Sequence, residues 1–315
     1  MKKDDSNLRP EELSNIKYHA KKLLDEAGVF NHFPTPINEI VKTAKLVVNN
    51  DLSLGDSEGI LSRFTGNIGK IARPHLHGLK KLLGLLHVPS GEIIIDHSQH
   101  ENKKTFIKLH ETGHGFLPHQ RKMYEFMEDG QFELDPETED LFEREANNFA
   151  CETLFQLELY EKMAADYITS IKTPIDLSKK FGSSIYASMR RYTQTHFAPL
   201  VLAIYDIQKE ITNIPCFCLR REPIYSTDFI KKFGFIKFPN PATVQNHLGS
   251  IMKSAKLQTY HKYELNDLNG NSYACSLHVF NNSYEVFVML IPEKKITHKT
   301  SAPITISDGI ISFLR

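Results

Sequence analysis

The stretch TFIKLHETGHGFLPH, residues 105–119, places His110, Glu111 and His114 close together in a largely apolar segment. An α-helix turns by about 100° per residue, so side chains four positions apart lie on one face, one turn from each other. The imidazoles of His110 and His114 can then bind a single metal ion. The stretch therefore predicts a helix that carries two ligands of a metal centre.

These residues also form the pattern His-Glu-x-x-His, which is typical of zinc peptidases. In that pattern the two histidines bind Zn²⁺ and the glutamate acts as a general base. Zinc lowers the pKa of a bound water from about 15.7 toward 7. We therefore predict Zn²⁺ as the cofactor and Glu111 as the catalytic residue, which takes a proton from water and passes it to the leaving amine.

A catalytic zinc usually has three protein ligands and one open position. A second helix is predicted from about residue 139 to 165, and its segment EDLFEREANNFACETLF offers Glu143 and Glu145. Its buried face is marked by Ala146, Phe149 and Ala150. Glu143 shares that face, whereas Glu145 is expected to point sideways. We therefore predict Glu143 as the third metal ligand. Asn147, one turn later, is predicted to hydrogen-bond a liganding histidine.

Other local signals predict how these helices begin and pack. Gly113 lies inside the motif helix, where glycine costs about 1 kcal/mol relative to alanine, so we expect a close neighbour there. The strand EIIID, residues 92–96, is the expected neighbour. Thr35 is the expected N-cap of a helix that begins near Pro36, and Asp140 that of the helix with Glu143. The acidic segment 128–140 is expected to be a loop.

Composition limits the classes of protein to which the chain can belong. Its 315 residues favour two or three domains, and Lys plus Arg balance Asp plus Glu at 38 each. No overall electrostatic attraction to nucleic acid follows from that balance. The N-terminus lacks the apolar core of a signal peptide, and no apolar run reaches the length of about 18 residues needed to span a membrane. We expect a cytoplasmic protein without a membrane partner.

The pattern along the chain predicts an α+β fold in three parts. Residues 1–165 read as a mainly helical metallopeptidase domain with a small sheet. Residues 166–197 read as a helical segment, two short helices broken at FGSS, residues 181–184. Residues 198–315 read as an α/β domain with several strands, in which Asn269-Gly270 is a strong hairpin signal.

Several of these segments together resemble the ImmA/IrrE family of metallopeptidases. The segments are PINEIVKTAKLVV, GEIIIDHS, FIKLHETGH and FEREANNFA. The order of the three parts is similar to the IrrE and CapP types, in which a zincin-like peptidase domain precedes a helix-turn-helix-like segment and a GAF-like sensor domain. In the family pattern His110 and His114 correspond to zinc ligands, Glu111 to the catalytic glutamate and Glu143 to the third ligand.

The resemblance implies a zinc endopeptidase that cuts one bond in a partner repressor of the helix-turn-helix type, in a DNA-damage or phage-defence response. It also implies single-stranded DNA as an activator. A second hypothesis is a transcription regulator that binds DNA through residues 174–196 and uses a non-catalytic peptidase-like scaffold. Arg190 and Arg191 would then touch the phosphate backbone. The oligomeric state stays open.

Overall fold

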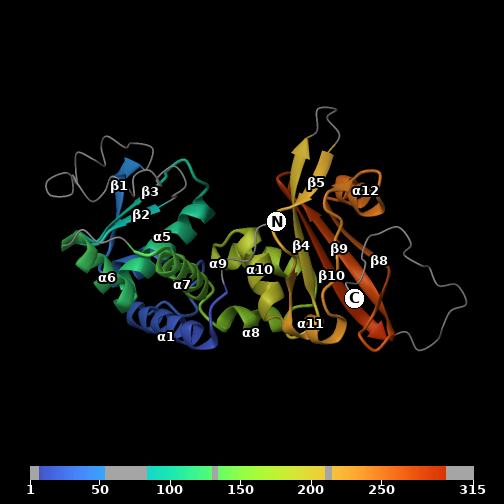
Figure 1. Ribbon diagram of the computed structural model, residues 1–315, viewed down its shortest axis with the longest axis horizontal. Helices are drawn as coiled ribbons and strands as arrows, with labels where there is room; N and C mark the ends of the chain where they lie inside the picture. Colours follow the sequence, from blue (N-terminus) through green and yellow to red (C-terminus); the bar gives the residue numbers. More distant parts are fainter. Residues whose placement is uncertain (1–6, 54–83, 130–133, 210–214, 296–315) are drawn as a thin grey trace, which may run out of the picture. The chain divides into compact units, whose positions relative to one another are not determined.

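The computed structural model describes residues 7–53, 84–129, 134–209 and 215–295 (Figure 1). Contacts divide the chain into two compact units. We call Asp5–Lys162 with Leu177–Ser184 the N-terminal unit, and Met1–Asp4, Met163–Asp176 and Ile185–Arg315 the C-terminal unit. Segment 166–197 thus supplies chain to both units, and the predicted domain boundaries after residues 165 and 197 stay a prediction.

The N-terminal unit is mainly helical. Its helices are α1 (Pro10–Ala27), α2 (Ile37–Thr43), α5 (Glu101–Phe116), α6 (Pro118–Asp129), α7 (Pro136–Leu154), α8 (Leu159–Ala165) and α9 (Lys172–Phe181). Part of α8 and part of α9 belong to the C-terminal unit. Helix α1 buries Ile16, Ala20, Leu23 and Leu24 and ends before its C-cap, Gly28. Gly28 has φ +65°, a left-handed conformation that glycine adopts without strain.

A small sheet lies beside the motif helix. Its strands are β1 (Val47–Ser53), β2 (Gly84–His87) and β3 (Glu92–Ile95), in the order β1-β3-β2. Strand β3 is parallel to β1 and antiparallel to β2, and its three isoleucines are buried. Helix α5 packs against both β2 and β3. Among the strands that the structure describes, β2 is therefore an edge strand next to the helix that carries the motif.

Helices α5 and α7 approach closely at Gly113. A Cβ atom on Gly113 would lie 3.2 Å from Cα of Ala146 and 3.2 Å from Cδ1 of Phe149. The expected neighbour, the strand EIIID, was therefore wrong: the glycine lets the backbones of two helices come together. This approach sets the histidine face of α5 against the Glu143 face of α7.

Two predicted helix starts also differ from the structure. Pro36 is the N-cap of α2, while the Thr35 hydroxyl donates instead to the carbonyl oxygen of Leu154 at 2.7 Å. Helix α7 begins at Pro136, and its N-cap is Asp135 rather than Asp140. The Asp-Pro pair is the stronger start signal, because proline at the first helical position loses no hydrogen bond. The predicted loop 128–140 is wrong at both ends, and residues 130–133 lie outside the described residues.

The C-terminal half of α9 belongs to the N-terminal unit and ends at Phe181. The Phe181 ring packs on Phe33, Phe155 and Tyr160, with ring centroids 5.0, 5.9 and 5.3 Å away. Its carbonyl oxygen accepts a hydrogen bond from the backbone N–H of Thr35 at 3.3 Å. The aromatic cluster thus closes one end of the N-terminal unit.

The C-terminal unit is built on a curled antiparallel sheet (Figure 1). Its elements are α10 (Ile185–Thr195), β4 (Val201–Lys209), β5 (Pro215–Leu219), β6 (Ile224–Tyr225), α11 (Thr227–Phe233), β7 (Ala242–Thr243), α12 (His247–Ser254), β8 (Leu257–Asn266), β9 (Ser272–Asn281) and β10 (Glu285–Lys295). The strand order is β7-β5-β4-β10-β9-β8, with β6 beside β4. One face buries an apolar core that includes Phe229 of α11 and Met252 of α12.

The structure confirms the α+β class, the two short helices around FGSS and the hairpin at Asn269-Gly270, which joins β8 to β9. Helix α10 packs against β4 and β6, and Gln194 is its one exposed residue. In the part of the chain that the structure describes, each helix is too short or too polar to cross a bilayer.

Candidate metal centre

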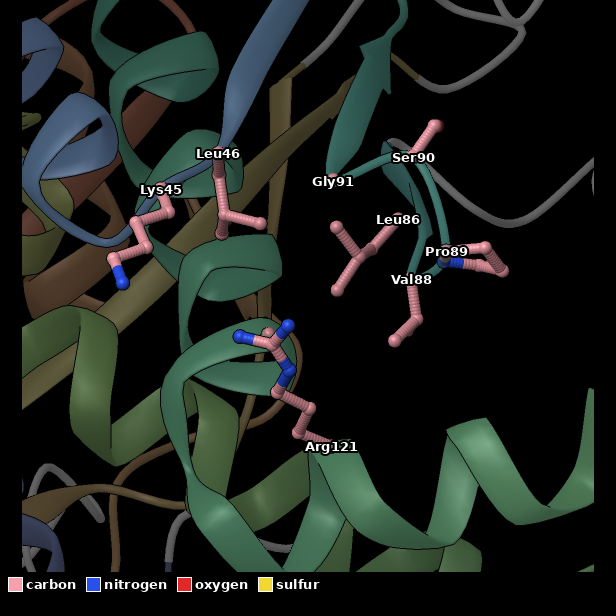
Figure 2. A pocket seen from close by; sticks show the side chains of 9 residues that line it. Lys45, Leu46, Leu86, Val88, Pro89, Ser90, Gly91 and Arg121 are labelled. Atoms are coloured by element: carbon pink, nitrogen blue, oxygen red, sulfur yellow. The ribbon is translucent and has the colours of Figure 1, made fainter.

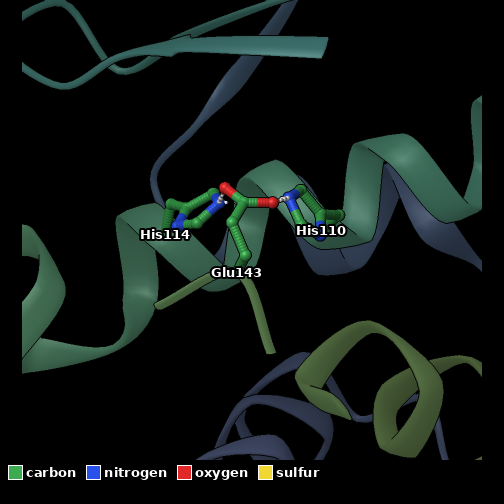
Figure 3. A group of neighbouring side chains, drawn as sticks. All are labelled: His110, His114 and Glu143. Carbon is green, nitrogen blue, oxygen red and sulfur yellow. Dashed lines mark hydrogen bonds and ion pairs between the residues drawn. The ribbon is translucent and has the colours of Figure 1, made fainter. Parts of the chain in front are cut away.

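Helices α5 and α7 bring His110, His114 and Glu143 together (Figure 3). One ligand atom from each lies within 4.8 Å of the others. The two carboxylate oxygens of Glu143 lie 3.3 Å from Nε2 of His110 and 3.4 Å from Nε2 of His114. The structure thus places the three predicted ligands around one point, as a metal site requires.

Two amide oxygens hold the outer nitrogens of the imidazoles. Nδ1 of His110 lies 3.1 Å from Oδ1 of Asn147, and Nδ1 of His114 lies 2.7 Å from Oε1 of Gln120. An amide oxygen only accepts, so each Nδ1–H donates to it, and the two Nε2 atoms, 3.1 Å apart, face the Glu143 carboxylate. Imidazole nitrogens and carboxylate oxygens are common metal ligands, so this set of donor atoms fits a metal cation.

The charges of the site favour the same conclusion. Burial alone would raise the pKa of Glu143, but hydrogen bonds and positive charge from His110 and His114 outweigh it, and the pKa is lowered. Burial would lower the pKa of His114, yet Glu143 and Glu111 reverse this and raise it. The site therefore keeps an ionised carboxylate and attracts positive charge, whether a proton or a metal ion.

Glu111 on α5 faces the edge strand β2 and lies close enough to His110, His114 and Glu143 for their charges to affect its pKa. Its side chain is buried, and burial raises its pKa, although His110 and His114 oppose the shift. The backbone N–H of Leu86 on β2 hydrogen-bonds the carboxylate. A Cβ atom at Gly84 would collide with it, so glycine is required there. Glu111 is thus fixed against β2, with a raised affinity for a proton.

A second layer of residues, which the sequence did not predict, lies behind His114. The Gln120 amide nitrogen donates to Oε2 of Glu145 at 2.7 Å and to the carbonyl oxygen of Phe142 at 3.2 Å, which fixes its oxygen toward His114. Nε2 of His119 lies 2.6 Å from the same carboxylate oxygen of Glu145. Glu145 therefore does not point sideways as expected but is buried. Gln120 lies in α6, beyond the end of α5, so the helical spacing of the motif does not predict where its side chain points.

Comparison with known proteins locates a family in this part of the chain. Residues 72–192 match the Peptidase_M78 family, described as the IrrE N-terminal-like domain. That span includes all the predicted site residues, and it supports the resemblance to ImmA/IrrE metallopeptidases there. No curated protein matches the sequence. A solved Mycobacterium tuberculosis transcriptional regulator is similar, with 10% identity and a TM-score of 0.48, over 89% of this chain and 76% of that chain.

Proposed function

We propose that this chain is a zinc-dependent, site-specific endopeptidase of the ImmA/IrrE type that cleaves a helix-turn-helix repressor in a DNA-damage or phage-defence response. One observation carries the proposal: two imidazole lone pairs and the ionised Glu143 carboxylate converge beside the buried carboxylate of Glu111. A structural metal site would not need a proton acceptor at Glu111.

His110, His114 and Glu143 would hold the zinc ion, which when bound polarises a carbonyl group and makes a water molecule more acidic. Glu111 moves the proton: its carboxylate accepts one from the attacking water and delivers it to the leaving nitrogen. Its raised pKa suits both steps, because a group that titrates closer to neutral pH can accept and release a proton. Asn147 and Gln120 keep the imidazoles oriented through their Nδ1 protons.

The edge strand β2 offers a place for the substrate backbone. Among the described strands β2 pairs with β3 alone, so its other edge is available to an extended peptide. The N–H of Leu86 points to Glu111 and thus to that edge. A substrate strand beside β2 would pass in front of the proposed base and ligands.

Replacement of Glu111 by Gln tests the proposal. The variant is expected to bind zinc as the wild type does and to lose about 10²- to 10⁴-fold in hydrolysis, the usual contribution of a general base. The substrates are the repressor encoded beside the gene and a mixture of randomised decapeptides, with and without zinc and single-stranded DNA. Intact-mass analysis detects a defined cut. Equal cleavage by the variant would contradict the mechanism.

The alternative hypothesis, a DNA-binding regulator, needs α10 to enter a groove with its side chains against the bases. Arg191 is buried and Gln194 is the one exposed residue of α10, so the helix offers little surface for that role. We propose instead that the C-terminal unit is the sensor, GAF-like in the family pattern, that responds to single-stranded DNA. Loss of the DNA effect on cleavage when residues 198–315 are replaced would support this assignment.

A further inference from the structure

A small hollow lies at the end of β2 (Figure 2). Its volume is about 100 Å³, and its lining comes from β2 and the following turn, from the segment before β1, and from α5 and α6. Gly115, which lines it, directly follows the ligand His114. Leu86, another lining residue, is the one whose N–H bonds Glu111. The hollow thus shares two elements, α5 and β2, with the proposed reaction site.

Glycine at residue 115 lets two leucines that line the hollow pack closely against α5. A Cβ atom there would lie 2.9 Å from Cδ1 of Leu46 and 3.1 Å from Cδ2 of Leu86. Both distances are shorter than ordinary carbon contacts of 3.5 to 4.0 Å, so a side chain at 115 would displace the leucines. The two leucines form apolar walls, which suit the aliphatic part of a side chain.

The charged side chains that line the hollow are both positive, Lys45 and Arg121. Figure 2 shows the Arg121 side chain rising from α6 toward the hollow, with Lys45 at the edge beyond Leu46. Nε of Arg121 bonds Glu125 at 2.9 Å, but both side chains are about half exposed, and such pairs are weak. Lys45 forms no ion pair with another residue that the structure describes.

We propose that this hollow is a subsite for an acidic side chain, glutamate or aspartate, of the substrate polypeptide; the inference rests on the proposed peptidase function. A peptide extended along β2 projects alternate side chains to the same face, and one of them reaches past Leu86. Its methylene groups lie against Leu46 and Leu86, and its carboxylate meets the guanidinium of Arg121 and the ammonium of Lys45. Arginine binds a carboxylate through two parallel hydrogen bonds. A basic side chain is excluded by like charge.

The test profiles cleavage of randomised decapeptides by the zinc-loaded protein, with the products sequenced by mass spectrometry. We expect Glu or Asp at one fixed position from the cut, enriched about tenfold over Gln and Asn. The double variant Lys45→Glu with Arg121→Glu should invert the preference to Lys and Arg at that same position. The milder Arg121→Gln should reduce the acidic enrichment, which keeps the test decisive if the double variant does not fold.

Lys122→Glu is the matched control. It makes the same charge change on an exposed neighbour in α6 that does not line the hollow, and it should keep the acidic preference. Cleavage without an acidic preference would overturn the subsite but not the peptidase function. The same holds if the Arg121→Gln variant keeps the full acidic preference. If the wild type cuts neither the decapeptides nor the repressor, the proposed function is lost, and the subsite with it.

Discussion

Oε1 of Gln120 lies 2.7 Å from Nδ1 of His114, and the amide nitrogen of the same side chain reaches the carbonyl oxygen of Phe142 at 3.2 Å. Gln120 thus connects His114, a proposed metal ligand on α5, to the backbone of α7, the helix that supplies Glu143. The hydrogen bond fixes both the tautomer and the rotation of the His114 ring. The position of one ligand is therefore tied to the helix that provides another.

Gln120→Ala should lower the affinity for zinc by about 10- to 100-fold, the usual effect of removing a hydrogen-bond partner of a metal-binding histidine. The measurement is competition with a chromophoric chelator. Gln99→Ala is the control, because Gln99 bonds Asp96 away from the site. Equal affinities of the Gln120 variant and the wild type would show that the ring is held by other contacts.

Glu143→Gln should reduce zinc binding more severely, because the neutral amide replaces the anionic ligand. Bound ligand stabilises a folded protein by about 2.7 kcal/mol at 100 times its Kd. Zinc should therefore raise the melting temperature of the wild type and have little effect on the variant, and a chelator should erase the difference. Glu139→Gln, an exposed change one turn earlier on α7, should respond to zinc like the wild type.

Gly113→Ala separates packing from helix propensity. Propensity alone would stabilise the helix by about 1 kcal/mol. The new methyl group would press on Ala146 and Phe149 at 3.2 Å, and overpacking of this kind costs about 1 to 3 kcal/mol. We expect a net loss of stability in urea unfolding followed by circular dichroism. A gain in stability would show that α7 can shift to accommodate the methyl group at little cost in free energy.

His278 should make the stability of the C-terminal unit sensitive to acid. Its ring is buried between hydroxyl groups of Thr259 and Ser276, and burial, with the charge of His261, lowers its pKa to about 4. The unfolded chain binds this proton near the ordinary pKa of about 6.5, so stability is full above that pH and is lost as the pH falls through 4. The loss approaches about 3 kcal/mol.

His278→Gln removes the titrating group, so the difference in urea stability between pH 7 and pH 4.5 should shrink relative to the wild type. Circular dichroism of the full chain follows the transition. The control is His247→Gln, a change to an exposed histidine at the start of α12. An unchanged pH dependence in the His278 variant would place the acid sensitivity elsewhere.

The sequence was most informative where one helix carries the pattern. The spacing of His110 and His114 and the apolar face shared by Glu143 and Ala146 depend on helical geometry alone, and the structure brings the three ligands together. Gln120 and Glu145 act across helices, and their contacts depend on the turn at Leu117 and on how α7 lies against α5. Local pattern does not contain that information. Gly113 shows the same limit: its need for space was predictable, but its neighbour was not.

The aromatic cluster around Phe181 determines where the N-terminal unit can be cut from the rest of the chain. A truncation after residue 165, where the change in pattern suggests a boundary, would remove Phe181 and leave Phe33, Phe155 and Tyr160 facing water. It would also strip Thr35 of the acceptor for its backbone N–H. A fragment of the N-terminal unit must therefore run through Ser184 to keep this cluster covered, because Leu177–Ser184 belongs to that unit.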